Sequence, residues 1–98
     1  MPTREEVYNA VDTEREYQDR LISILDQEDM HELAMGEHLA VLNKLLADAH
    51  DSWYSEAAPY PDTMPLIRKI AGVCVQAMEK YGAPERELPS GLVDRKAS

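Results

Sequence analysis

The sequence predicts an all-α fold, in which a long first helix and a helical hairpin form a three-helix unit. Apolar residues recur at intervals of three and four over long stretches, and no long stretch alternates as a strand does. A chain of 98 residues supports one hydrophobic core, and its apolar fraction of 44% is ordinary for a globular domain. We therefore expect a single helical domain over residues 1–82 and a mobile, polar tail over residues 83–98.

The first helix is expected at about residues 4–25. Thr3 and Glu6 have the spacing of a capping box, in which each side chain accepts a hydrogen bond from the other residue's backbone N–H. An apolar stripe at heptad spacing follows, made of Val7, Val11, Leu21 and Leu25.

Two polar residues, Glu14 and Gln18, occupy the middle of this stripe. A carboxylate on an apolar helix face needs a partner, because burying it alone costs several kcal/mol. One interpretation is that Glu14 faces a ligand or metal pocket between helices. The other is a paired polar layer that fixes the helix register, with Arg68, Lys69 or a tyrosine hydroxyl as the partner.

The second and third helices are expected at about residues 30–54 and 64–81. Pro65 is tolerated in the first turn of the third helix, and Gly82 followed by Pro84 is typical of a helix end. The second helix carries the clearest periodic pattern of the chain, a stripe of Met35, Leu39, Leu42, Leu46, Ala49 and Trp53.

The third helix indicates self-association. Between Ile70 and Met78 only Gln76 is strongly polar, and a helix that is apolar around most of its circumference has to be covered around most of it. Gly72 also leaves room for another backbone to come close. We expect a homo-oligomeric helix bundle, most simply a dimer with four or six helices in its bundle. The alternative is a monomeric bundle with the third helix in its middle.

Charge and composition exclude several classes of protein. The net charge of −9 argues against binding to DNA, RNA or an anionic membrane, which need a basic face. No apolar run is long enough to span a membrane, and the N-terminus lacks the apolar core of a signal peptide. The single Cys74 fits a reducing compartment. These features predict a cytoplasmic protein without a resident cofactor.

Residues of the third helix suit a phosphate-bearing ligand. Arg68 and Lys69 lie in its first turns, where free backbone N–H groups also favour anions. Aromatic residues before that helix would stack on a base. The alternative is that both cations pair with the acidic first helix. The ligand-binding set that we expect consists of Glu14, Tyr17, Gln18, Trp53, Arg68 and Lys69.

Two stretches carry a resemblance to known families. "EREYQD" (14–19) and "IRKIAGVCVQAMEKYGAPERE" (67–87) resemble segments of short phage-encoded helical proteins. In its helical pattern the first helix is also similar to MazG-like nucleotide pyrophosphohydrolases, which hold Mg²⁺ with glutamates and an aspartate on two helices. The third helix departs from that family, because it has no acidic residue before Glu79. The ligand set that the resemblance implies is Glu14, Glu16, Asp19 and Glu37.

The function expected from this resemblance is that of a small, non-enzymatic binding protein of phage type. Its partners would be itself and either a host protein or a nucleotide-like signal, which it would sequester against host defence in the host cytoplasm. One alternative is a Mg²⁺-dependent MazG-like nucleotide pyrophosphohydrolase. A second alternative is a structural assembly subunit.

Overall fold

The computed structural model describes residues 1–26 and 34–88 of the chain. Within these ranges it contains three helices and no strand: α1 (Arg4–Asp26), α2 (Met35–Tyr54) and α3 (Thr63–Tyr81). The predicted all-α class is therefore confirmed. The start that we expected for the second helix, at about residue 30, lies outside the described residues, as does the part of the expected tail over residues 89–98.

Side chains near the helix ends explain where the helices begin. The backbone N–H of Glu6 donates to Thr3 Oγ1 (3.1 Å) and the N–H of Thr3 donates to the Glu6 carboxylate (3.4 Å), so the predicted capping box is present. At α2 the Glu37 carboxylate accepts the N–H of Ala34 (3.1 Å). These bonds satisfy N–H groups that have no partner inside a helix.

The start of α3 is capped from outside the helix. Asp62 is the N-cap residue, but its side chain makes no capping bond. Instead the Glu56 carboxylate, in the preceding loop, accepts the backbone N–H groups of Asp62 (3.2 Å) and Thr63 (2.8 Å) and the Thr63 hydroxyl. This arrangement fixes the loop to the helix that follows it.

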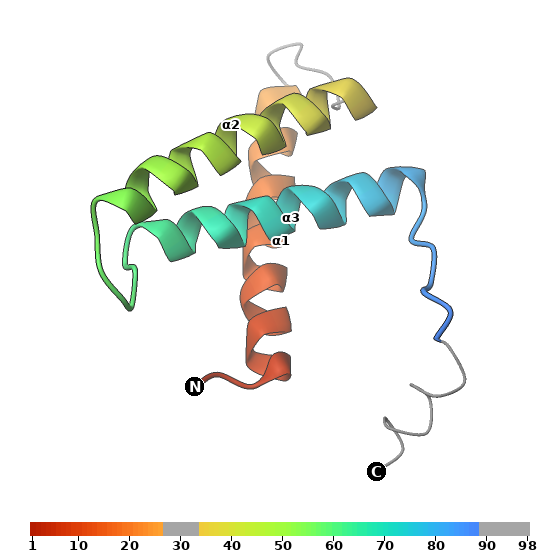
Figure 1. Ribbon diagram of the computed structural model, residues 1–98. Coiled ribbons are helices and arrows are strands. Elements are labelled where there is room, and N and C mark those ends of the chain that lie inside the picture. The colour runs from red at the N-terminus through yellow and green to blue at the C-terminus, as the bar shows by residue number, and fades with distance from the viewer. Residues whose placement is uncertain (27–33, 89–98) are drawn as a thin grey trace.

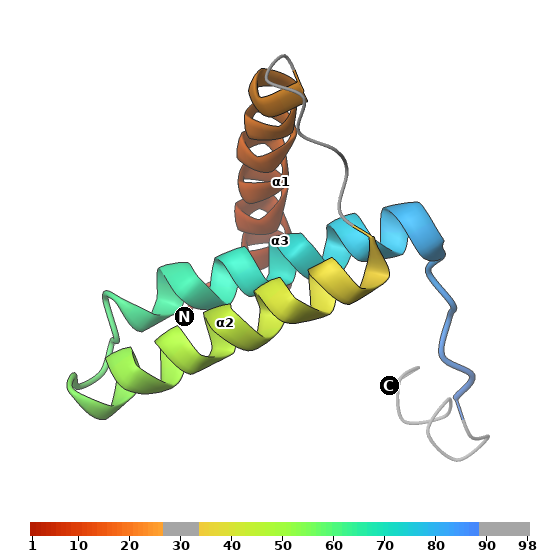
Figure 2. The same cartoon turned by 90° about the horizontal axis from the view of Figure 1, so that it is seen from above.

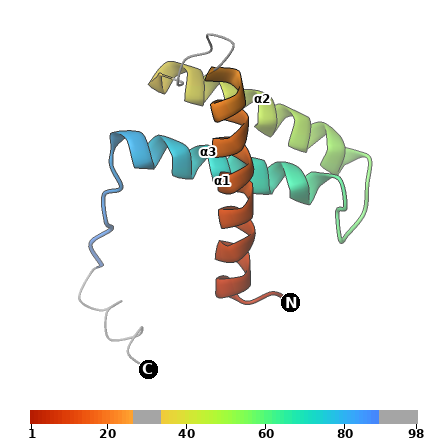
Figure 3. The ribbon, with the colours of Figure 1, turned by 180° about the vertical axis from the view of Figure 1, so that it is seen from behind.

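Helices α2 and α3 form a helical hairpin, and α1 packs across it. Helices α2 and α3 run antiparallel side by side, and α1 crosses α3 transversely near its middle (Figure 1). Seen from above, α1 and α2 lie on different sides of α3 (Figure 2), and the view from behind shows α1 in front of α3 (Figure 3). The half of α1 before the crossing therefore projects past α3, away from α2.

The apolar core of the described chain is small. Among the described residues, only Ala49 and Val73 are buried apolar side chains, while large apolar side chains on all three helices remain half-exposed. A crossing at one point explains this, because α1 covers only the middle of α3. None of the helices in the described part of the chain is long and apolar enough to cross a membrane.

Candidate functional site

The contact between α1 and α3 is polar at its centre. Two consecutive residues of α1, Glu14 and Arg15, are buried there, although both are charged. Burial of a charge is costly without a partner, so a cluster of this kind is either paired within the fold or prepared for a ligand. The polar cluster consists of Glu14, Arg15, Gln18 and Asp19 from α1 with Arg68 and Glu79 from α3.

Gly72 sets how closely the two helices approach. A Cβ atom at this position would lie 2.8 Å from Cγ of Glu14 and 2.8 Å from Nε2 of Gln18. Real Cβ atoms do not come so close to other heavy atoms. The close approach that we expected at Gly72 is therefore made by two polar side chains of α1.

Glu14 is paired within the fold. Its carboxylate is 5% exposed and accepts a hydrogen bond from Nε of Arg68 (2.9 Å) at Oε1. The amide of Gln18 donates to its other oxygen, over 3.4 Å. A cation and an amide thus compensate the buried charge, as the interpretation of a register-fixing polar layer requires.

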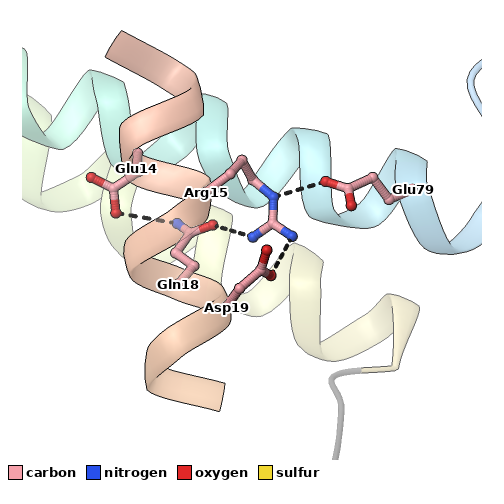
Figure 4. A network of polar contacts seen from close by, with 5 residues as sticks. All are labelled: Glu14, Arg15, Gln18, Asp19 and Glu79. Carbon is pink, nitrogen blue, oxygen red and sulfur yellow. Dashed lines mark hydrogen bonds and ion pairs between the residues drawn. The ribbon is translucent and has the colours of Figure 1, made fainter. Parts of the chain in front are cut away.

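Arg15 joins the two helices on the other flank of the crossing (Figure 4). Its guanidinium donates to Glu79 from Nε (2.8 Å), to Gln18 from Nη1 (3.0 Å) and to Asp19 from Nη2 (2.8 Å). Burial lowers the pKa of Arg15, but the hydrogen bond to Glu79 and the charges of Asp19 and Glu79 outweigh it and raise the pKa. The guanidinium therefore stays charged and binds three partners at once.

Gln18 connects both halves of the polar cluster. Its amide nitrogen donates to Glu14 and its amide oxygen accepts from Arg15 (Figure 4). The sequence interpretation missed the roles of Arg15 and Glu79. The separation of four residues between Arg15 and Asp19 was the available signal, because side chains at that spacing meet on a helix.

A small cavity lies beside the polar cluster. It measures about 310 Å³ and is lined by Thr13, Glu14, Tyr17, Arg68 and Lys69. The structure therefore brings together most of the expected ligand-binding residues, with Gln18 bonded to Glu14 at the crossing.

Trp53 is not part of that assembly. It lines another cavity, of about 400 Å³, near the closed end of the hairpin between α2 and α3. The expected set of six ligand-binding residues is therefore divided between two places. The sequence could not show this division. Trp53 and Arg68 are near each other along the chain, but the loop between α2 and α3 reverses the chain direction, and the two side chains line different cavities.

The four carboxylates that the MazG-like resemblance implies do not converge. Glu14 is held by Arg68 and Asp19 by Arg15, while the Glu37 carboxylate binds a backbone N–H at the start of α2 and Glu16 is exposed. Over residues 1–26 and 34–88, no group of three or more His, Cys, Asp or Glu side chains has the arrangement of a metal site. Hydrolysis assisted by Mg²⁺ needs several carboxylates at one point.

Comparison of the chain with protein-family models, with curated proteins and with solved structures finds no match. The resemblance to phage-encoded and MazG-like helical proteins thus stays a hypothesis.

Proposed function

We propose that the protein is a small, non-enzymatic binding protein that works as a homo-oligomer. One observation supports this most strongly: the carboxylates at the helix crossing are bound within the chain, while large apolar side chains remain half-exposed on every helix. Charged groups used in this way hold a scaffold together, and exposed apolar patches of this extent are typical of surfaces that bind another protein.

The cavity beside Tyr17 is the place where a nucleotide-like ligand would bind. Arg68 and Lys69 provide positive charge for a phosphate, and the exposed ring of Tyr17 offers a face for stacking. Arg68 keeps its Nε on Glu14, so a phosphate would bind the outer edge of the guanidinium. The other proposed partner, which the phage resemblance implies, is a host protein.

The test compares binding with turnover. Thermal melts of the purified chain would be recorded with nucleoside triphosphates and cyclic nucleotides, each with and without Mg²⁺ or Mn²⁺, and the same mixtures assayed for pyrophosphate. We expect no pyrophosphate release under any condition. A metal-dependent rise in melting temperature together with turnover would overturn the proposal in favour of the pyrophosphohydrolase.

A charge-removing variant identifies the ligand site. If a nucleotide raises the melting temperature without metal, Lys69→Ala should reduce that rise, because Lys69 lines the cavity and is exposed. Lys44→Ala is the control, since Lys44 lies on α2 and pairs with Asp48 instead (2.8 Å). An equal rise in all three proteins would place the ligand elsewhere.

A further inference from the structure

Both helices of the hairpin carry a heptad pattern along most of their length. In each, apolar residues alternate by three and four positions, which is the spacing of helices that pack against each other in coiled coils. On α2 the pattern is Met35, Leu39, Leu42, Leu46, Ala49 and Trp53, and on α3 it is Met64, Ile67, Ala71, Cys74, Met78 and Tyr81.

Most of these positions are left open by the hairpin itself. Eight of the twelve side chains are 41 to 53% exposed: Met35, Leu39, Leu46, Trp53, Met64, Ile67, Met78 and Tyr81. Helix α2 turns His38 and Ala49 inward, and α3 turns Val73 inward; all three are buried. The contact inside the hairpin therefore uses one flank of each pattern and leaves the other flank exposed.

The two exposed flanks meet on one side of the hairpin at its closed end, and the heptad spacing continues each stripe along its own helix from there. Leu46 and Trp53 from α2 line one cavity together with Met64 and Ile67 from α3. We call the eight half-exposed side chains of these two patterns the seam face. It has no charged residue at any of these positions.

The first half of α1 borders the same face. A cavity of about 350 Å³ is lined by Val7 and Val11 from α1 and by Met64 and Ile67 from α3. Val7 is itself half-exposed. Because this half of α1 projects past α3 (Figure 1), it would flank any helix that packs on the seam face.

We propose that a second copy of the chain covers the seam face, so that two hairpins pack face to face as a four-helix bundle, flanked by the first halves of both α1 helices. This inference rests on the self-association in the proposed function and identifies its surface. In a two-fold arrangement the same face serves both copies, and each α1 contacts the hairpin of the other copy.

The available area is what a stable dimer needs. A half-exposed side chain of this size leaves on the order of 100 Å² accessible, so the eight side chains present roughly 800 Å² per copy. A standard protein interface buries about 800 Å² on each partner. The seam face is thus large enough for a specific dimer without help from other surfaces.

The small core favours a second copy of the chain as the partner that covers the seam face. In the described part of the chain, only Ala49 and Val73 are buried apolar side chains. Burial of apolar surface therefore contributes little to the stability of a single chain. A cover over the seam face would add the buried apolar area that the chain lacks, and another copy is at hand wherever the chain is present. A different protein would supply this area only where it is also present.

The first test compares two single substitutions, one at a heptad position and one at the residue next to it. Leu46→Glu places a carboxylate on the seam face in both copies, whereas Ala47→Glu places it one residue further along α2, at an exposed position off that face. Sedimentation equilibrium should give a dissociation constant at least about 100-fold higher for Leu46→Glu than for the wild type, because an unpaired charge is costly to bury. Ala47→Glu should dimerise as the wild type does.

Trp53 gives a readout that needs no variant. It is the single tryptophan of the chain and lies half-exposed on the seam face. In a dilution series of the wild-type chain, followed in parallel by light scattering, its emission should lie at shorter wavelength at high concentration, where the chain is associated, than at low concentration. This second measurement holds even where Leu46→Glu fails to fold.

The outcomes separate the two proposals. A wild-type dimer that dissociates on dilution without a change in Trp53 emission, or a dimer that Leu46→Glu leaves intact, overturns the seam face and leaves self-association standing. A wild type that is monomeric throughout the series overturns both. Dimerisation that is lost in Leu46→Glu, kept in Ala47→Glu and accompanied by the emission shift supports both.

Discussion

Nε of Arg68 lies 2.9 Å from Oε1 of Glu14, so a half-exposed cation on α3 compensates a carboxylate on α1 that is 5% exposed. The two partners therefore differ in how much they depend on each other. Without Glu14, Arg68 still has access to water. Without Arg68, the one hydrogen bond that Glu14 keeps from the described residues is that of the Gln18 amide, at 3.4 Å.

This asymmetry predicts unequal effects of removing either partner. Arg68→Ala should lower the free energy of unfolding by about 2 kcal/mol, because it leaves a buried carboxylate without its cation. Glu14→Leu should be neutral or stabilising, because it removes the cost of burying the carboxylate and leaves a half-exposed Arg68 that water can solvate. Urea unfolding at one fixed chain concentration measures both. A larger loss for Glu14→Leu than for Arg68→Ala would contradict the assignment.

A second prediction concerns the close approach at Gly72. Gly72→Ala gains about 1 kcal/mol of helix propensity, but its Cβ would meet Glu14 and Gln18 at 2.8 Å, and overpacking of this kind costs about 1–3 kcal/mol. We expect a net loss of about 1 kcal/mol in the free energy of unfolding. Thermal or urea unfolding provides the measurement.

Gly36 is the matched control for that substitution. It lies in α2, and a Cβ there would meet nothing within 4 Å. Gly36→Ala should therefore stabilise the chain by about 0.5–1 kcal/mol. An equal gain in stability for both variants would contradict the close contact between α1 and α3 at Gly72.

The sequence was sufficient for the helices but not for their crossing. Periodicity indicated three helices, and the capping box of Thr3 and Glu6 indicated where the first begins, since both are properties of one helix at a time. The stripe from Val7 to Leu21 indicated which side of the first helix is apolar, yet it carries no information on the angle at which a neighbour packs. In the structure Glu14 and Gln18 meet α3 at Gly72, while Val7 and Leu21 remain exposed on either side.

The sequence reduced the possible partners of Glu14 to a few residues but did not select one of them. Arg68, Lys69 and a tyrosine hydroxyl were all reasonable partners for Glu14, and consecutive residues on a helix point in different directions, so only the crossing angle selects Arg68. No pattern in the sequence singled out Arg15. It is buried because α3 crosses α1 transversely and brings Glu79 to its guanidinium.

A third prediction follows from the cap that Glu56 makes on α3. The hydrogen bond from the Thr63 hydroxyl, together with the backbone N–H groups of Thr63 and Asp62, lowers the pKa of Glu56 from 4.5. A lowered pKa in the folded state stabilises the fold above the unfolded value, and this contribution is lost as the pH falls through the folded value. The stability difference between wild type and Glu56→Gln should thus be constant near neutral pH and shrink below about pH 4.5.

The control for this pH dependence is Glu16→Gln, which removes an exposed carboxylate from α1 that takes no part in the cap. It removes the same charge as Glu56→Gln but leaves the cap on α3 intact, so the pH dependence that the cap causes should be absent from its stability difference. Urea midpoints measured from neutral to acid pH give both curves. A Glu56→Gln difference that grew toward acid pH would have the wrong sign and would exclude the cap as its source.

The last prediction separates Arg15 from an ordinary surface cation. Its guanidinium reaches Glu79, Gln18 and Asp19 with three different nitrogens, at 2.8, 3.0 and 2.8 Å. A lysine ammonium is a single point and cannot take all three positions, so Arg15→Lys should lower the free energy of unfolding by about 1–2 kcal/mol. Arg20→Lys, at an exposed position of the same helix, should change it by less than about 0.5 kcal/mol. Urea unfolding compares the two, and equal effects would show that the fork of Arg15 does not hold α1 on α3.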